Sequence, residues 1–234
     1  MTADSAAKFD PSRAAEYERQ SRIGLAGYDA CHELSACMLA ATLGAGSRAR
    51  ILVAGGGGTG SEILSTGRLE PGWTFVVVDP SEPMLDLAMG RIAEAGLSDR
   101  AEAVLGAVAD LPSGPTFDAA TLIGVIHHLP GAAAKASILG DIADRLAPGA
   151  PLIVAGNCRA YASEPLLMAA WGNRWRMNGA PEDEIAAKLG KILQGADPPV
   201  SDEAVEALLK AAGFGPPKRF FASLFWGAWI CTRL

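Results

Sequence analysis

The stretch Ile51-Leu-Val-Ala-Gly-Gly-Gly-Gly-Thr-Gly-Ser-Glu62 decides the fold class of this chain. Its first four residues are apolar, as in a buried strand, and five of the next six are glycine. Glycine lets the backbone turn tightly and lets a ligand approach the main chain, while the helix expected next offers unpaired N–H donors. This order of strand, glycine loop and helix predicts a site of the nucleotide-binding type.

A carboxylate follows the glycine loop at a suitable distance. Nineteen residues after Gly60, the next apolar strand ends at Asp79. Such a carboxylate can accept both ribose hydroxyls, through charge-assisted hydrogen bonds worth about 1.5–3 kcal/mol each. The alternatives are a turn-forming or capping role for Asp79 and a flexible linker for the glycines. Because Gly55, Gly57 and Gly60 also fit the dinucleotide spacing G-x-G-x-x-G, a nicotinamide enzyme stays open.

Around this motif, short apolar runs alternate with amphipathic helical patterns. Ser81 can cap one such helix and Gly96 can end it, and Pro148-Gly149 stops another. We therefore predict an α/β fold with a doubly wound, Rossmann-like, mostly parallel seven-stranded sheet whose last strand is antiparallel. The apolar runs of the core are Ile51–Ala54, Phe75–Val78, Ala103–Leu105, Ala119–Val125 and Pro151–Ala155.

The pattern divides the chain into four segments. A helical N-terminal cap is expected over 1–45, with an apolar face of Leu34, Cys37, Met38 and Ala41. The core covers 46–157, and a helical insertion over 158–200 is expected to form a lid and a dimer surface. The segment 201–234 predicts a final helix from its cap Ser201 to Gly213, then a hairpin of strands 218–222 and 226–232.

Composition narrows the function classes. Among 234 residues, 20 Lys and Arg face 26 Asp and Glu, giving a net charge of −6, and half of all residues are hydrophobic. Disordered, collagen-like and disulfide-scaffold classes are excluded, and a nucleic-acid partner is not expected. The four cysteines form no Cys-x-x-Cys pair, so reduced and mostly buried thiols are expected. Since neither a signal segment nor an 18-residue apolar run is found, we expect a cytoplasmic protein without membrane association.

The second half of the core carries a more specific pattern. Phe117-Asp-Ala-Ala-Thr-Leu-Ile-Gly-Val-Ile-His-His-Leu129 precedes a helix ending Arg145-Leu-Ala-Pro-Gly-Ala150 and the strand Pro151-Leu-Ile-Val-Ala155. With Val78-Asp-Pro-Ser-Glu-Pro-Met84, this order resembles the class I S-adenosylmethionine-dependent methyltransferases over about residues 48–157. The resemblance implies S-adenosyl-L-methionine as cofactor and S-adenosyl-L-homocysteine as product.

Within that family the chain resembles the carboxy-S-adenosylmethionine synthase branch and its methyltransferase relatives. The similar stretches are Arg22-Ile-Gly-Leu-Ala-Gly-Tyr28, Arg176-Met-Asn-Gly179 with the acidic residues after it, and Lys210-Ala-Ala-Gly-Phe214. The resemblance implies a homodimer in which the insertion contributes across the interface. It also implies that Tyr28 contacts the cofactor, although a packing role for this residue is equally open.

Three positions depart from the family pattern. Ala54 replaces the acidic residue that usually ends the first strand, so a contact to the cofactor's amino group is missing. Gly106-Ala-Val108 replaces an acidic position near the adenine, and the arginine used against the extra carboxylate falls at Leu189. The loss at Leu189 favours ordinary S-adenosylmethionine over its carboxylated form.

The resemblance implies a cofactor site in which Asp79 holds the ribose, Ala107 and Val108 flank the adenine, and Ile123 lines the methionine side. The expected cofactor-binding residues are Tyr28, Gly55, Gly56, Gly57, Gly58, Asp79, Pro80, Ala107, Val108 and Ile123. Methyl transfer from a sulfonium is an in-line displacement, so the protein chiefly supplies alignment, which can contribute about 7–11 kcal/mol.

His127 and His128 follow the fourth strand, at the edge where ligands bind in doubly wound folds. They are the candidate catalytic residues, because histidine can accept a proton from a hydroxyl or amine at neutral pH. The alternative is that the pair only packs against the cofactor. His32 is expected to be a surface or packing residue, and no metal site is expected, since no carboxylate completes a set with His127, His128 and Cys158.

Four residues of the insertion are candidates for acceptor binding. Trp171 and Trp175 share a helical face, and Arg174 and Arg176 lie beside them. The tryptophans would form an aromatic wall and an arginine would meet an anionic acceptor. Packing in the core or at a dimer contact is the alternative.

The leading hypothesis is a methyltransferase acting on a small-molecule acceptor. Conversion of the cofactor itself, using a carboxylate donor, is the second. A NAD-dependent oxidoreductase is the third, although no recognisable Tyr-x-x-x-Lys pair supports it. A catalytically silent partner subunit is the fourth.

Overall fold

The computed structural model describes residues 11–234, with side chains from residue 16 onward, so the start of the predicted N-terminal cap lies outside the described residues. The described chain forms a seven-stranded sheet in the order β3-β2-β1-β4-β5-β7-β6. The first five strands are parallel, and β7 runs antiparallel to both β5 and β6. This confirms the predicted fold class. The strands are β1 (Arg50–Ala54), β2 (Thr74–Asp79), β3 (Ala101–Leu105), β4 (Ala119–Ile123), β5 (Pro151–Asn157), β6 (Lys218–Ser223) and β7 (Trp226–Thr232).

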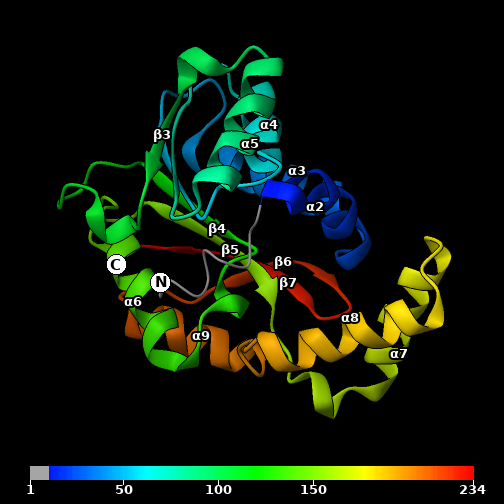
Figure 1. Ribbon diagram of the computed structural model, residues 1–234. Helices are drawn as coiled ribbons and strands as arrows, with labels where there is room; N and C mark the ends of the chain where they lie inside the picture. Colours follow the sequence, from blue (N-terminus) through cyan, green and yellow to red (C-terminus); the bar gives the residue numbers. More distant parts are fainter. Residues whose placement is uncertain (1–10) are drawn as a thin grey trace.

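Helices cover both faces of the sheet (Figure 1). Successive side chains of a strand point to opposite faces. Ile51 and Val53 of β1 therefore pack with α3 (Tyr28–Leu43), α4 (Ser61–Leu69) and α5 (Glu82–Glu94). Leu52 and Ala54 face the other layer, formed by α6 (Gly131–Ala143) and α9 (Asp202–Ala211). Burial on both faces explains why the core strands read as continuous apolar runs.

The predicted helix ends are mostly confirmed. The hydroxyl oxygen of Ser201 accepts a hydrogen bond of 3.2 Å from Ala204 N, and Gly96 and Gly213 adopt φ of 73° and 84°, as glycines that end helices do. Ser81 occupies the position before α5, but its side chain makes no capping bond. Its main-chain N–H donates to Asp79 Oδ1 instead, at 2.8 Å.

The apolar face predicted for the N-terminal cap is wrong. The cap is helical, as α2 (Pro11–Gly24) and α3, but Leu34 is 42% exposed and Cys37 and Ala41 are also exposed. The buried side of α3 instead contains polar residues, which a search for apolar spacing overlooks. The hydroxyl of Ser35 is accommodated there by donating to Cys31 O at 2.7 Å. The buried residues of α3 are Tyr28, Cys31, His32, Ser35, Ala36 and Leu39.

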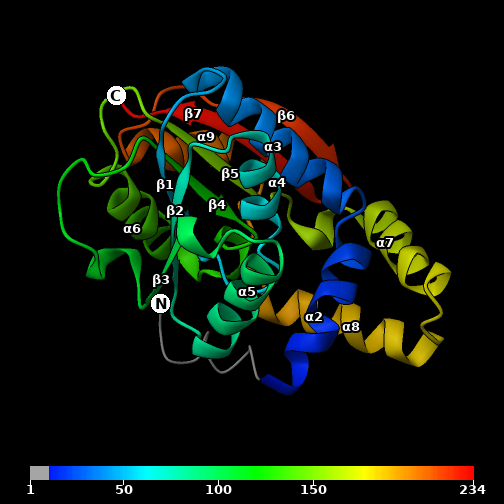
Figure 2. The same cartoon turned by 90° about the horizontal axis from the view of Figure 1, so that it is seen from above.

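The insertion is helical as predicted, with α7 (Pro165–Met177) and α8 (Glu182–Gly195). Figure 2 shows both helices on the same side of the molecule as α2. Trp171 Nε1 donates to Gly24 O at 2.8 Å, and Arg174 Nε donates to Ile23 O at 2.9 Å. These bonds join α7 to the end of α2. The division into four segments stays a prediction.

Two further features bear on the sequence expectations. Cys31, Cys158 and Cys231 are buried free thiols, whereas Cys37 is an exposed one. Within residues 11–234, no helix is both long and apolar enough to cross a bilayer.

Candidate active site

The carboxyl ends of β1, β2, β4 and β5 meet at one edge, where the strand order changes direction and where doubly wound sheets bind ligands. The glycine loop lies between β1 and α4 at this edge. Gly55 adopts a φ of 67°, which an L-residue rarely adopts, and its N–H donates to Val78 O at 2.8 Å. A Cβ on Gly57 would lie 2.7 Å from both Asp79 Oδ2 and Met84 Cβ. The loop is therefore held tightly against β2 and α5.

Asp79 orders this loop. Its Oδ2 accepts from Gly57 N at 3.0 Å and its Oδ1 from Ser81 N at 2.8 Å. Burial raises the pKa of the carboxyl, and these two main-chain bonds partly offset the rise. Each carboxylate oxygen keeps a further lone pair, so the same group can still accept from a ligand. The turn-forming alternative and the ligand-binding prediction are thus compatible.

Two cavities lie along the strand ends. The first has a volume of about 340 Å³ and reaches from the glycine loop and Asp79 to the insertion. The second, of about 560 Å³, lies beside the end of β3 and is lined by Gly106, Ala107 and Val108 and by one side of α6. Both are lined by Gly55, Pro80, Val125, His128, Leu129 and Ala196, so the two cavities adjoin, and together they are called the trough.

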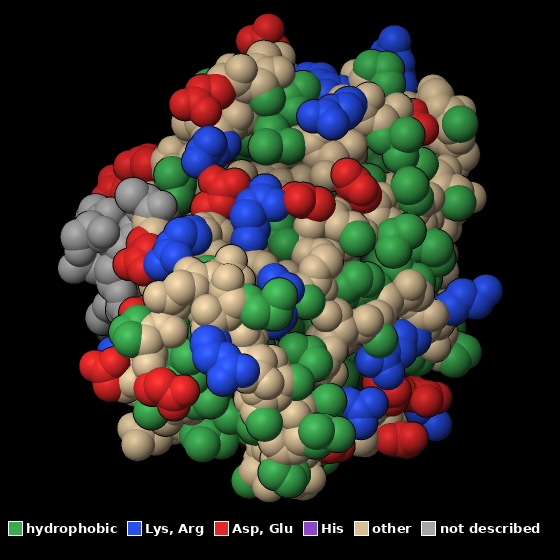
Figure 3. Space-filling model, turned by 90° about the vertical axis from the view of Figure 1, so that its right-hand side faces the viewer, with side chains coloured by type: hydrophobic (Ala, Val, Ile, Leu, Met, Phe, Trp, Pro, Cys, Tyr) green, Lys and Arg blue, Asp and Glu red, His purple; other side chains and the backbone are tan. Residues whose placement is uncertain are grey.

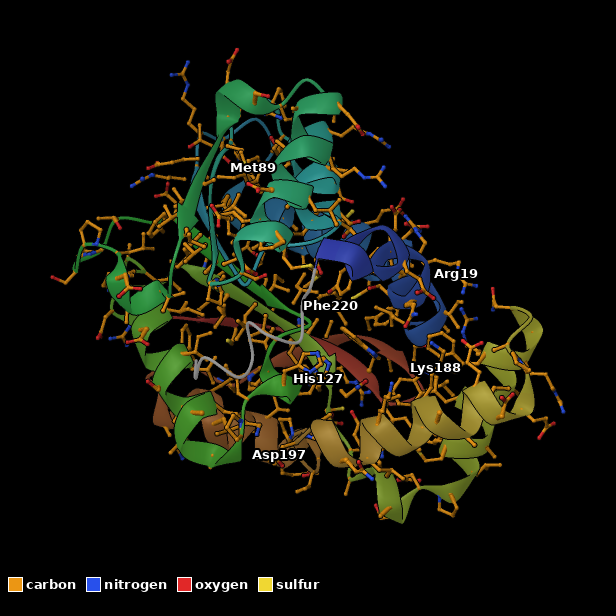
Figure 4. All side chains as sticks on the ribbon, in the orientation of Figure 1. Arg19, Met89, His127, Lys188, Asp197 and Phe220 are labelled. Atoms are coloured by element: carbon orange, nitrogen blue, oxygen red, sulfur yellow. The ribbon has the colours of Figure 1, made fainter. Side chains whose placement is uncertain are left out.

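The two histidines differ in environment. His127 is buried, whereas His128 is exposed. Figure 4 shows His127 between the sheet and helix α8. Burial lowers the pKa of His127 well below its usual value, and His128 and Lys135 lower it further, so the ring is neutral at neutral pH. Its Nδ1 accepts only a long hydrogen bond of 3.4 Å, from Asn157 N.

Tyr28 connects the N-terminal helices to the glycine loop. Its hydroxyl forms hydrogen bonds with Thr59 Oγ1 and with Ser61 Oγ, the second at 3.3 Å. The centroid of its ring lies 4.6 Å from that of the His32 ring, and the guanidinium carbon of Arg22 lies over the Tyr28 ring at 4.9 Å from the centroid. Tyr28 therefore lines the first cavity and also holds the loop in place.

The structure separates the four acceptor candidates of the insertion. Trp171 and Trp175 line the first cavity. Arg174 does not, because Ile23 O and Arg22 O, both at 2.9 Å, occupy its guanidinium. Arg176 is exposed and does not line it either. The arginines therefore lie away from the cavity in which they were expected to meet an anionic acceptor.

The other expected ligand residues divide between the cavities. Ile123, Pro80 and Gly55, Gly56 and Gly57 line the first, and Ala107 and Val108 line the second. Gly58 lines neither, and a Cβ there would lie 2.7 Å from the ring of Tyr17.

Several cavity residues were not predicted from the sequence. Glu62 and His32 are buried and line the first cavity, and Glu62 Oε2 and His32 Nδ1 have no hydrogen-bond partner among the described residues. Glu62 reads as an ordinary first-turn acid of a helix, and His32 as a packing residue. Asn157, Tyr161 and Trp226 also line this cavity, and no sequence motif marks them.

Residues 54–152 match the family model described as a methyltransferase domain. This segment is therefore similar to methyltransferase domains. This match supports the predicted enzyme class and the predicted cofactor, S-adenosylmethionine. The matched segment contains the glycine loop, Asp79 and both histidines, and it ends before the insertion.

Solved structures share the fold at low sequence identity. PigF with SAH is 16% identical, with a TM-score of 0.66, over 96% of this chain and 60% of that one. The mitomycin 7-O-methyltransferase MmcR is 21% identical, with a TM-score of 0.62, over 86% of this chain and 54% of that one. An O-methyltransferase family 2 protein from Planctomyces limnophilus in complex with apigenin is 16% identical, with a TM-score of 0.61, over 88% and 62%.

The chain thus spans between 54% and 62% of the length of these three proteins. No curated protein matches its sequence.

Proposed function

We propose that this chain transfers the methyl group of S-adenosylmethionine to a small, largely apolar aromatic acceptor. The observation that carries the proposal is the trough of two adjoining cavities, one at the end of β3 and one that reaches from the glycine loop and Asp79 to an aromatic wall at the insertion. A cofactor with an adenine at one end and a reactive sulfonium at the other fits such a trough. The acceptor would then occupy the aromatic part.

The residues of the trough suit this cofactor. The glycine loop lines the first cavity with main chain that carries no side chains, and Asp79 retains lone pairs for the ribose hydroxyls. Ala107 and Val108, in the second cavity, would flank the adenine, and Ile123 would line the methionine side. Tyr28 and Pro80 would complete the contacts. The cofactor supplies an activated methyl group on a sulfonium.

The acceptor part of the trough is aromatic and carries few polar groups. Tyr161, Trp171, Trp175 and Trp226 line it, and an aromatic ring can pack against such faces. Two buried polar atoms there, Asn157 Oδ1 and Trp175 Nε1, have no hydrogen-bond partner in the described chain. An acceptor that offers a donor to Asn157 and a carbonyl to Trp175 would satisfy both. Since Arg174 and Arg176 lie elsewhere, an anionic group on the acceptor is not required.

His127 is the residue to which we assign proton removal. A neutral imidazole has one unprotonated nitrogen, and burial keeps His127 neutral at physiological pH. Replacing His127 with Asn should lower kcat by about 10²- to 10⁴-fold on phenolic acceptors that the wild-type protein methylates, while the affinity for S-adenosylhomocysteine stays the same. An equal loss in His128→Asn alone would transfer the role to the exposed ring.

Calorimetry with S-adenosylhomocysteine tests the proposal without knowledge of the acceptor. The wild-type protein should bind it, and Asp79→Ala should weaken binding at least tenfold, because two ribose hydrogen bonds are lost. Asp86→Ala, an exposed position on the adjoining helix α5, is the matched control. Absence of binding to the wild-type protein, or equal affinity in both variants, would contradict the assignment.

Each of the alternative functions is tested by a different measurement. Conversion of the cofactor would leave an extra carboxylate on protein-bound cofactor, visible by mass spectrometry. Leu189 on α8 offers no cation for that group. A nicotinamide enzyme would bind NAD(H), and a silent subunit would bind the cofactor without turnover on any acceptor.

The partners follow from the same reasoning. Figure 3 shows a face of the molecule on which basic and acidic side chains are interspersed. Interspersed charges of both signs do not favour a nucleic acid, which binds clustered cations, so we propose a small-molecule acceptor. The homodimer, the cytoplasmic location and the role of 158–200 as a lid remain part of the proposal.

A further inference from the structure

Glu62 is a buried acid without an ion-pair partner among the described residues. It lies in the first turn of α4, directly after the glycine loop, and is 9% exposed. Its Oε2 has no hydrogen-bond partner among the described residues, and no described cation forms an ion pair with it. Burying a carboxyl without such partners is costly, so the position calls for a partner from outside the chain.

The carboxyl lines the first cavity, beside the loop that would hold the cofactor. If the adenine occupies the cavity at β3 and the ribose lies at Asp79, the amino-acid end extends toward the remaining part of the first cavity. Tyr28 lines the first cavity next to its partners Thr59, Ser61 and His32, and Glu62, which follows Ser61, lines the same cavity. Glu62 is the acidic residue among these five, and the amino-acid end carries one ammonium group.

The residue at the end of β1, Ala54, cannot bind the ammonium group in place of Glu62. It ends β1, is fully buried and carries no group that could bind an ammonium. We propose that the Glu62 carboxylate binds the ammonium of the cofactor's amino-acid end, from the first turn of α4 rather than from the end of β1. This inference rests on the proposed function, and it adds a specificity residue to it.

Among the titratable groups around Glu62, only Glu62 itself is expected to lose a proton when the cofactor binds. Burial raises its pKa to about 8, so the carboxyl is mostly protonated at pH 7, and Thr121 offsets the rise only in part. Burial raises the pKa of the Tyr17 phenol on α2 and of the Tyr28 phenol and Cys31 thiol on α3, so these groups stay protonated. Burial lowers the pKa of His32, which stays neutral. Asp79 on β2 faces the uncharged ribose. An incoming ammonium would therefore ionise Glu62.

Three ligands separate the ammonium from the rest of the cofactor. S-adenosylhomocysteine carries both the ammonium and the carboxylate, its decarboxylated analogue keeps only the ammonium, and 5′-methylthioadenosine has neither. Calorimetry should show that Glu62→Gln weakens the first two at least about tenfold and leaves the third unchanged. Glu82→Gln, an exposed first-turn acid on the adjacent helix α5, is the matched control and should change none of them.

Unchanged binding of 5′-methylthioadenosine also shows that the variant is folded. If Glu62→Gln binds S-adenosylhomocysteine as tightly as the wild type, or weakens all three ligands equally, the inference is wrong and the proposed function stands. If the wild-type protein binds none of the three, the proposed function fails and the inference fails with it.

A second measurement needs no variant. Titrations at pH 7 in buffers of different ionisation enthalpy count the protons released on binding. Wild-type protein should release about one proton per S-adenosylhomocysteine and none with 5′-methylthioadenosine, which contacts the ribose site but brings no charge. Release of the same number with both ligands would overturn the assignment to Glu62.

Discussion

The ammonium nitrogen of Lys135 lies 2.8 Å from Asp197 Oδ2, and this ion pair joins α6 of the core to the segment that follows α8. The lysine side chain is almost completely buried and also donates to Leu129 O at 2.7 Å. Asp197 in turn accepts from Gly131 N at 2.7 Å, and its own N–H donates to His127 O at 2.8 Å. Figure 4 shows Asp197 below His127. Asp197, near the end of the insertion, thus holds both the start of α6 and the histidine turn.

Replacing Asp197 with Asn should lower the free energy of unfolding by about 1–2 kcal/mol. The loss falls below that for a fully buried pair, because Asp197 itself is largely exposed while the lysine charge stays buried. Urea unfolding at pH 7 measures this loss in the free energy of unfolding. Asp144→Asn, at an exposed position at the end of α6, should stay within about 0.5 kcal/mol of wild type. Equal stability of the two variants would show that the pair contributes nothing.

Two glycine substitutions should have opposite effects. A Cβ at Gly57 would collide with Asp79 and Met84, whereas a Cβ at Gly90, inside α5, meets nothing within 4 Å. Gly57→Ala should therefore destabilise the protein by about 1–3 kcal/mol and weaken S-adenosylhomocysteine binding. Gly90→Ala should stabilise it by about 0.5–1 kcal/mol and leave binding unchanged. Thermal unfolding with and without ligand distinguishes them, and a loop that tolerates Gly57→Ala would contradict the close packing described.

Glu62 should make the unliganded protein less stable as pH rises. Its pKa is about 8 in the folded protein and 4.5 as its ordinary value, so the folded state holds the proton more tightly. Stability is therefore fully present below pH 4.5 and is lost as pH rises toward 8, by about 3 kcal/mol at pH 7. Glu62→Gln lacks this loss. The difference in unfolding free energy between variant and wild type, measured in urea, should grow in favour of Gln between pH 5 and 7, and a constant difference would show that Glu62 is not perturbed.

His32 should act in the opposite direction. Burial lowers its pKa from 6.5 to about 4, so the unfolded chain binds the proton first as pH falls. Stability is present above pH 6.5 and is lost below it, by about 2 kcal/mol at pH 5. In His32→Leu this contribution should disappear, and the variant should gain stability relative to wild type between pH 7 and 5. Parallel pH profiles of the two proteins would contradict the assignment.

The fold could be predicted from the sequence because its signals are local. An apolar run buried on both faces, a glycine that turns the chain and a residue that caps a helix each act within a few positions of themselves. Residues 51–62 are the clearest case, since each glycine there either adopts a positive φ or lies too close to a neighbouring side chain to carry a Cβ. The prediction of the buried face of α3 was wrong because burial there depends on which elements pack against the helix. Polar His32 and Ser35 are buried against α4 and the sheet edge, and the more apolar Leu34 is exposed.

The candidate site was harder to predict because its parts lie far apart in the chain. Asp79 and the glycine loop belong to one motif and could be found together. Arg174 could not be separated from Trp175 by spacing, since its partners are the carbonyls of Arg22 and Ile23 at the end of another helix. Glu62 carried no signal at all, because an acid in the first turn is ordinary until its burial is known.

The aromatic wall of the first cavity, where we propose that the acceptor binds, lies outside the segment 54–152. Leu25 comes from the N-terminal cap, Tyr161, Trp171 and Trp175 from the insertion, and Trp226 from the last strand. Because these residues are separate from those around the glycine loop, selection can alter one set while the other is retained. Exchange of the flanking segments could therefore change the acceptor while the core is kept. A chimaera of this core with flanks from another chain should still hold the methyl donor through the core residues that this chain already has.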